Sequence, residues 1–209
     1  MRYERKYLLQ HISLTDIQQV INLHPAAFRL AFPSRKINNV YFDTANFSAY
    51  SDNVKGIAQR SKFRIRWYGE QGDFIRKPVL EEKIKRGELG YKNAQKVNDF
   101  DWKNLNQIAQ EIPQITQQNL HPVLINSYLR HYYISFDNRF RITIDEQMEF
   151  AAFSLVNHPN KTENIFPENK VIEMKYEESD SPKADWISQY LPFRPTKHSK
   201  YVIGVDACF

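Results

Sequence analysis

The sequence has only six glycines and one cysteine, and it contains no long run of apolar residues. The cysteine, Cys208, has no partner for a disulfide within the chain, which is typical of proteins of the reducing cytoplasm. No apolar stretch approaches the ~20 residues that cross a bilayer, so we expect no direct membrane span. The first residues, MRYERKYLLQ, are charged from the second position and lack the apolar core of a secretory signal. We therefore expect a cytoplasmic protein.

The chain also lacks a Gly/Ser-rich or Pro-rich linker and an internal repeat, so we predict a single domain over residues 1–209. Its 29 Lys and Arg outnumber its 24 Asp and Glu, which gives a formal net charge of +5. A basic balance indicates an anionic partner, but it does not distinguish nucleic acid, a membrane surface and a phosphate compound. The sequence does not indicate the oligomeric state.

Periodic patterns predict three helices and at least seven strands. The helices are expected at 13–24, 99–112 and 179–190, with Pro113 ending the second and Ser181 capping the third ahead of Pro182. The strands are expected at 2–9, 37–44, 59–69, 74–85, 127–136, 139–150 and 170–177. Residues 69–73, GEQGD, read as a hairpin turn. Strands without βαβ alternation favour an antiparallel α+β fold.

Several of the predicted strands alternate apolar and charged residues. In KFRIRWY (62–68), Lys62, Arg64 and Arg66 share one face and the apolar residues share the other. The pattern recurs in 2–6, 79–85, 139–145 and 171–175. Such a face is either exposed to solvent or, in a closed sheet, turned inward around a bound polyanion. The abundance of arginine favours the second reading, because a guanidinium grips phosphate oxygens in pairs.

Nine segments together resemble a known family. They are YERKYLL (3–9), YFDT (41–44), RSKFRIRWYG (60–69), LEEKIKRG (80–87), GYK (90–92), HPVLINSYLRHYY (121–133), RFRITID (139–145), VIEMKY (171–176) and KHSKY (197–201). In this order they resemble the VTC domain, the polyphosphate polymerase-like branch of the CYTH or triphosphate tunnel metalloenzyme superfamily. The resemblance spans nearly the whole chain.

The resemblance implies an α+β fold built on an antiparallel eight-stranded β-barrel, a triphosphate tunnel with a polar lumen, flanked by about three helices. It also implies the site residues. The residues that match the family's phosphate ligands are Lys6, Arg64, Arg66, Lys83, Lys92, Arg130, Arg141, Lys197, Ser199 and Lys200. Glu173 matches the metal-binding glutamate, with Glu4 as a second candidate for Mn²⁺ or Mg²⁺. Arg64, Arg66, Lys200 and Glu173 are the residues we expect to be catalytic.

One position departs from the family. The ExExK signature reads R-x-E-x-K here because Arg2 stands at its first acidic position, which leaves Glu4 as the only acid near the N-terminus. A more cationic lumen suits a long phosphate chain better than a two-metal hydrolase. The leading hypothesis is therefore metal-dependent synthesis of polyphosphate from ATP. The alternatives are an inorganic triphosphatase or nucleoside triphosphatase, and a non-catalytic polyphosphate-binding module.

Three further expectations concern individual residues and partners. Glu81 and Asp145 are expected to form internal salt bridges more than to bind metal, because a lumen of mixed charge needs such partners. Asp43 is expected to order the turn that follows it. Carboxylates interleaved with the arginines argue against nucleic acid as the partner. A separate protein would have to supply any membrane part.

Overall fold

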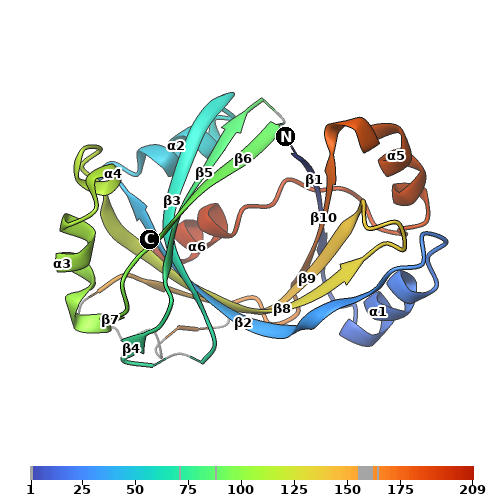
Figure 1. Cartoon of the computed structure of the whole chain (residues 1–209), viewed down its shortest axis with the longest axis horizontal. Coiled ribbons are helices and arrows are strands. Elements are labelled where there is room, and N and C mark those ends of the chain that lie inside the picture. Colours follow the sequence, from blue (N-terminus) through green and yellow to red (C-terminus); the bar gives the residue numbers. More distant parts are fainter. Residues whose placement is uncertain (1, 71, 88, 155–161, 164) are drawn as a thin grey trace. The chain divides into compact units, whose positions relative to one another are not determined.

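The computed structural model describes residues 2–70, 72–87, 89–154, 162–163 and 165–209. Within these residues the chain has an α+β fold with a mostly antiparallel sheet of eight strands and six α-helices (Figure 1). The α+β class predicted from the sequence is thus confirmed. The strands of the sheet are β1 (Arg2–Leu9), β2 (Arg29–Asp43), β3 (Gln59–Tyr68), β5 (Val79–Arg86), β6 (Leu89–Lys96), β8 (His121–Ile134), β9 (Arg141–Ala152) and β10 (Lys170–Glu177).

The strands follow one another in the sheet in the order β1-β10-β9-β8-β2-β3-β5-β6. Two short strands, β4 (Phe74–Ile75) and β7 (Phe100–Asp101), form a separate pair. The helices are α1 (Leu14–Asn22), α2 (Ser48–Val54), α3 (Leu105–Gln110), α4 (Pro113–Thr116), α5 (Ser181–Gln189) and α6 (Lys200–Cys208), with 3₁₀ turns η1 (Trp102–Asn104) and η3 (Glu178–Asp180).

The chain divides into two compact units. The first unit comprises Met1–Arg35, Leu129–Met148 and Phe166–His198. The second unit comprises Lys36–Tyr128, Glu149–Ile165 and Ser199–Phe209. The single domain over residues 1–209 stays a prediction.

In the first unit, β10 pairs antiparallel with β1 and with β9. Alternation along these strands sends residues such as Tyr7, Ile144 and Met174 to an apolar face. That face is covered by α1 and α5, whose Ile17, Ile21, Ala184 and Ile187 are buried in the same core (Figure 1). Ser13 caps α1 by accepting a hydrogen bond from the Asp16 amide. The opposite, polar face of the strands is left for charged side chains.

In the second unit, β3 pairs antiparallel with both β2 and β5, and β5 pairs with β6. The core includes Phe63, Ile65 and Trp67 of β3. These are the apolar residues that alternate with the charged residues in KFRIRWY. Helix α3 and turn η1 add Leu105 and Trp102 to this core. The charged residues of β3 therefore lie on the other face of the strand, as the alternation predicts.

The helix and strand predictions need several corrections. The helix predicted at 99–112 is shorter, because residues 100–104 form β7 and η1 and α3 covers Leu105–Gln110. Pro113 follows the C-cap of α3 by two residues and opens α4, where its missing N–H costs nothing. Asp180, rather than Ser181, stands at the N-cap of α5. The predicted strand 74–85 is interrupted before Val79, and Phe74 and Ile75 pair instead with β7. The predicted hairpin turn at 69–73 includes Gln71, which lies outside the described residues.

The eight-stranded antiparallel sheet agrees with the sequence analysis, but the closure of this sheet into a barrel stays a prediction. In the described part of the chain, no helix combines the length and the apolar character that a bilayer crossing requires.

Candidate functional site

Three cations of the second unit meet around the carboxylate of Glu81. Arg64 and Glu81 face each other across β3 and β5, and Arg64 donates to Glu81 Oε2 from Nε at 2.9 Å and from Nη2 at 2.7 Å. Lys92 on β6 donates to Glu81 Oε1 at 2.6 Å. Arg66 Nη1 lies 3.6 Å from Glu81 Oε2. These four residues are called the Glu81 cluster below.

The neighbouring cations keep the Glu81 carboxyl group ionised. Burial of Glu81 would raise the pKa of its carboxyl group, but the charges of Arg64, Arg66 and Lys92 outweigh burial and hold that pKa well below its usual range. The predicted role of Glu81 as a salt-bridge partner is confirmed. Three cations nevertheless share one carboxylate, so the cluster retains an excess of positive charge that an anion can neutralise.

Neutral polar residues fix the direction of the Arg66 side chain. Its Nε donates to Asn39 Oδ1 at 2.9 Å and its Nη2 donates to the Tyr128 hydroxyl at 2.9 Å. Asn39 in turn donates to Asn126 on β8. All three partners are buried, and Arg66 is only 7% exposed. The guanidinium is therefore preorganised, which lowers the entropy cost of gripping an anion.

The first turn of α6 brings two more of the predicted residues to the second unit's polar face. Ser199 is the N-cap of α6 and accepts a hydrogen bond from Lys62 Nζ at 2.8 Å. Lys200, the first helical residue, is buried with its amine 4.7 Å from the centre of the Tyr128 ring. Since the Tyr128 hydroxyl also accepts from Arg66, the structure brings Lys200 and Arg66 to the same tyrosine.

A second group of charges lies in the first unit and is called the Glu173 cluster. Glu173 on β10 has Lys6 Nζ 3.3 Å from its Oε1, and it has Lys175 Nζ and Arg130 Nη2 at 3.1 Å and 3.3 Å from its Oε2. Glu4 Oε1 lies 3.8 Å from Lys6 Nζ and 3.7 Å from Lys175 Nζ. The two predicted metal ligands thus share both lysines as neighbours.

Asp145 completes this group by pairing with Arg130. Arg130 donates from Nε to Asp145 Oδ1 at 2.5 Å and from Nη2 to Oδ2 at 2.6 Å, while Asp145 is fully buried. This bidentate pair confirms the predicted salt-bridge role of Asp145. Unlike the Glu81 cluster, the first unit's group balances its lysines and arginine with carboxylates.

The carboxylates of the Glu173 cluster suit a hard divalent cation. Mg²⁺ and Mn²⁺ are bound in phosphate-handling sites by one or two carboxylates, with phosphate oxygens and water completing the shell. Glu4 and Glu173 are carboxylates of this kind, and both lie within 4 Å of the amines of Lys6 and Lys175. Among the described residues there is no group of three or more His, Cys, Asp or Glu side chains arranged as a complete protein cage for a metal. The ion would therefore depend on its substrate for further ligands.

Three predicted phosphate ligands lie at the margins of these groups. Lys83 is half-buried on β5 and stands opposite Lys62 on β3 and Lys92 on β6. Arg141 is exposed at the start of β9, opposite Lys175. Lys197 is exposed in a segment that runs beside β1, where the Lys6 amine donates to the His198 carbonyl at 3.0 Å. Lys83 and Arg141 therefore stand in register with one member of each cluster, Lys92 and Lys175.

Four neutral residues that support the arginines were not among the predicted site residues: Asn39, Tyr41, Asn126 and Tyr128. Tyr41 accepts a hydrogen bond from Arg64 at 3.1 Å, just as Tyr128 accepts one from Arg66. Alternation places Asn39 and Tyr41 on one face of β2, opposite Arg66 and Arg64 in register. Their position on the same strand face could have identified Asn39 and Tyr41. Neutral residues, however, do not form the alternating charge pattern from which the site residues were predicted.

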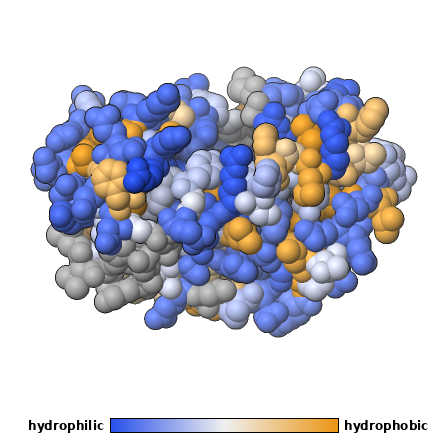
Figure 2. Space-filling model, turned by 60° about the horizontal axis from the view of Figure 1, so that its bottom comes forward, coloured by the Kyte–Doolittle hydropathy of each residue, from blue (hydrophilic) through white to orange (hydrophobic). Residues whose placement is uncertain are grey.

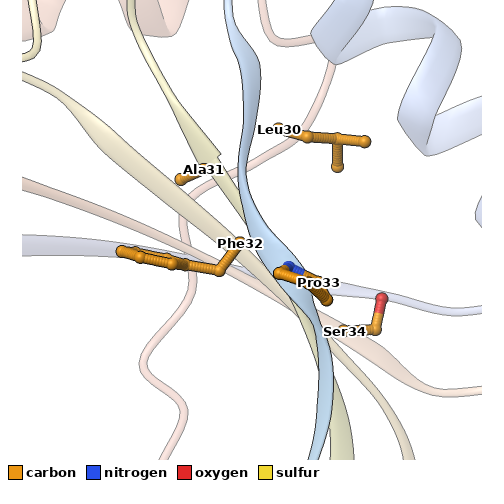
Figure 3. Close-up of a pocket in the computed structure, with 5 residues that line it drawn as sticks. All are labelled: Leu30, Ala31, Phe32, Pro33 and Ser34. Carbon is orange, nitrogen blue, oxygen red and sulfur yellow. The ribbon is translucent and has the colours of Figure 1, made fainter.

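A hollow of about 400 Å³ lies elsewhere, along residues Leu30–Ser34 of β2 (Figure 3). Its lining is apolar apart from Ser34, and Leu30 and Phe32 are exposed. Figure 2 shows that hydrophobic side chains reach the surface among hydrophilic ones. Since none of the lining residues is charged, this hollow offers a phosphate chain no counter-charge, and we place the candidate site at the charged clusters instead.

Solved structures of distant proteins share this fold. A protein from Pyrococcus horikoshii OT3 matches with a TM-score of 0.60 and 12% identity over 99% of both chains. A proposed adenylate cyclase from Vibrio parahaemolyticus matches with a TM-score of 0.57 and 9% identity, over 96% of this chain and 97% of its own. A Hippeastrum protein, a proposed adenylyl cyclase described as having a dominant triphosphatase activity, matches with a TM-score of 0.53 and 14% identity over 99% and 97%. At these identities the likeness concerns the fold alone.

The family itself follows from the sequence. The model of the VTC domain family matches residues 1–209, so the chain belongs to the VTC domain family. This confirms the family resemblance, while the assignment to its polyphosphate polymerase-like branch stays a prediction. No curated protein matches the chain in sequence.

Proposed function

We propose that this protein catalyses metal-dependent phosphoryl transfer on a triphosphate or polyphosphate, most specifically the synthesis of polyphosphate from ATP. The observation that carries the proposal is the Glu81 cluster, in which preorganised arginines and a lysine surround a single buried carboxylate. Phosphoryl transfer asks a protein mainly for positioning and for neutralisation of charge, which such a cluster supplies.

We assign different roles to the two clusters, phosphate binding to one and metal binding to the other. The cation-rich Glu81 cluster, with Lys200, suits the non-bridging oxygens of a phosphate chain, because arginine pairs with them in bidentate fashion. The charge-balanced Glu173 cluster suits the metal. Glu173 and Glu4 would hold Mn²⁺ or Mg²⁺, which supplies Lewis-acid polarisation of phosphate oxygens when it is bound. In this proposal the sheet closes into a tunnel, as the family resemblance implies.

Each proposed catalytic residue has a distinct task. Arg64 and Arg66 hold the transferring phosphoryl group and neutralise the charge that develops on its oxygens. Lys200 adds a point charge beside Arg66, and Lys6, Lys83, Lys92, Arg130, Arg141, Lys197 and Ser199 complete the phosphate-binding set. In the polymerase reaction the nucleophile is itself the terminal phosphate of a growing chain. Cationic side chains therefore favour the approach of donor and acceptor alike, whereas a water nucleophile needs no such support.

The product formed from ATP tests this proposal. Purified protein incubated with ATP and Mn²⁺ is expected to yield a ladder of polyphosphate chains on a gel. The Arg66→Ala variant is expected to lose about a hundredfold in rate, the magnitude found when one transition-state charge contact is removed. Arg76→Ala is the matched control, because Arg76 is exposed and stacks over Phe74 away from the cluster. Full activity of Arg66→Ala would contradict the proposed role.

A triphosphatase is the second candidate function. It is favoured by the carboxylates of the Glu173 cluster and by the activity described for the Hippeastrum protein of similar fold. Release of orthophosphate from triphosphate or ATP, without longer phosphate chains, would show that the protein is a hydrolase and not a polymerase. Tight binding of triphosphate without turnover under any divalent metal would instead indicate a binding module. Absence of triphosphate binding would overturn all three.

The proposal extends to the setting of the reaction. We propose a cytoplasmic location, where ATP is plentiful and Cys208 stays reduced. Nucleic acid is not proposed as a ligand, since both clusters interleave carboxylates with their cations. Any coupling of the product to transport would require a separate membrane partner.

A further inference from the structure

The first turn of α6 carries Ser199 and Lys200, and its position is decided by the residue that follows them. The Tyr201 hydroxyl donates to Asp43 Oδ2 at 2.5 Å, and Asp43 is fully buried at the end of β2. The two residues are 158 positions apart in the chain. Burial raises the pKa of Tyr201, and the hydrogen bond to Asp43 raises it further, so the hydroxyl remains a donor at physiological pH.

The same carboxylate organises the start of α2. Asp43 Oδ1 accepts hydrogen bonds from the amides of Thr44 at 2.7 Å and Ala49 at 2.9 Å, and Oδ2 accepts one from the amide of Tyr50 at 3.1 Å. These bonds hold the carboxylate rigidly, because three backbone groups fix its orientation. A rigid acceptor in turn fixes the direction of the Tyr201 side chain. Asp43 therefore orders the following turn, as the sequence predicts, and in addition anchors α6.

The Tyr201 ring also touches the residues that support the phosphate site. Its centre lies 5.1 Å from the centre of the Tyr41 ring, and Tyr41 accepts a hydrogen bond from Arg64. Lys62 Nζ lies 5.5 Å from the Tyr201 ring centre and donates to Ser199. One side chain thus links the N-cap of α6 with the tyrosine that holds Arg64.

We propose that Asp43 and Tyr201 are positioning residues, which lock the first turn of α6 so that Lys200 meets the bound phosphate chain beside Arg66. This inference rests on the proposed function, because it takes Lys200 as a phosphate ligand. It adds a fixed internal anchor to that site. Without the anchor the helix keeps its sequence and its fold, but its first turn loses the contact that orients the Lys200 amine.

A double-mutant cycle tests the inference with triphosphate as the probe. Tyr201→Phe keeps the buried ring and removes only the hydroxyl. In the wild-type background we expect about a tenfold loss of triphosphate affinity by calorimetry, the scale of one hydrogen bond to a charged group. In the Lys200→Ala background, Tyr201→Phe is expected to cause no further loss, because the hydroxyl acts through Lys200. Asp43→Asn, which keeps the side-chain volume, serves as a second variant should Tyr201→Phe fold poorly.

Tyr50→Phe is the matched control. The Tyr50 hydroxyl donates to Asp206 at 2.5 Å, so it also joins α2 to α6, but at an exposed position near the other end of α6. Tyr50→Phe is expected to leave triphosphate affinity unchanged. Equal losses from Tyr201→Phe in both backgrounds, or no loss in either, would overturn the positioning role. Failure of the wild-type protein to bind triphosphate would overturn the proposed function instead, so the two failures are distinguishable.

Discussion

Glu81 is the residue that makes the positive charge of β3 compatible with a folded sheet. It pairs with Arg64 and Lys92 and lies near Arg66, so like charges along β3 have a counter-charge on the neighbouring strand. A ligand is therefore not required for the fold to tolerate the row. The residual positive charge is what a ligand would neutralise, which separates the structural role of Glu81 from the proposed binding role of its partners.

Glu81→Gln is expected to lower the free energy of unfolding by about 3–5 kcal/mol at pH 7, because it leaves the buried Arg66 and the half-buried Arg64 without their carboxylate partner. The effect depends on pH with a definite sign. The folded-state pKa of Glu81 is depressed, so its contribution is fully present above the unfolded pKa of about 4.3 and is lost as pH falls below it. Urea unfolding of both proteins from pH 7 to pH 3 should show the gap narrowing in acid. A gap that stays constant over this range would refute the pairing.

Glu173→Gln separates binding from catalysis. The substitution keeps the side-chain volume and removes the proposed metal ligand, so we expect turnover with Mn²⁺ to fall by about a hundredfold or more. Triphosphate binding measured in EDTA should persist, since the Glu81 cluster is untouched. Glu178→Gln, at an exposed position in η3, is the control. Unchanged Mn²⁺-dependent turnover in Glu173→Gln would exclude the metal role.

The alternation of charged and apolar residues was enough to place the charged face of β3 and β10. It also predicted the pairing of Glu81 and Asp145, because an enclosed set of cations needs internal acids. Alternation could not predict which carboxylate forms an ion pair with which cation. It also could not identify Asn39 or Tyr128 as site residues. The role of a neutral polar residue depends on its hydrogen-bond partner, and that partner is known only once the chain is folded.

Among the elements, α6 follows Ser199 and begins with Lys200, two of the proposed phosphate ligands, yet the sequence does not predict it as a helix. Its sequence, KYVIGVDAC, contains β-branched residues and a glycine, which are unfavourable in an isolated helix. Packing overrides that preference. At Gly204, an added Cβ would come within 2.5 Å of Leu124 and 2.6 Å of Phe150, so the helix backbone lies directly against other side chains. A local pattern does not contain that information.

Gly204→Ala is therefore expected to push α6 away from Leu124 and Phe150. Overpacking of this kind costs about 1–3 kcal/mol, which chemical denaturation can measure. Because Ser199 and Lys200 begin the same helix, triphosphate affinity should fall together with stability. Gly56→Ala is an informative comparison, since an added Cβ there meets no atom within 4 Å although its φ of +71° makes the substitution strained. A loss of stability there without a loss of affinity would assign the affinity effect of Gly204→Ala to α6.

Strands and helices with polar sequences escaped prediction for a related reason. Strand β6 is mostly exposed and α2 buries none of its residues, so neither carries a hydrophobic period. Both are held by their neighbours, β6 by pairing with β5 along its whole length. In contrast, α1 and β10 have a clear apolar face and an identifiable start, and the sequence located both closely.

For the whole molecule, the uneven distribution of charge is the most informative feature. The Glu81 cluster has an excess of cations, whereas the Glu173 cluster balances its cations with acids. Binding of triphosphate in the absence of metal should therefore weaken steeply with ionic strength, since salt screens the exposed part of such an attraction. Affinities measured by calorimetry at about 50 mM and 500 mM salt check this. Affinity that is independent of salt would argue against binding at the cationic cluster.

The proposed function places a phosphate chain at Arg64, Arg66 and Lys200 and a divalent ion at Glu173. A crystal structure of the protein soaked with triphosphate and Mn²⁺ tests it most directly. We predict phosphate oxygens in contact with Arg64, Arg66 and Lys200, anomalous density for Mn²⁺ at the Glu173 carboxylate, and a sheet closed around the ligand. Triphosphate bound away from Arg64, Arg66 and Lys200, or the absence of Mn²⁺ at Glu173, would contradict it.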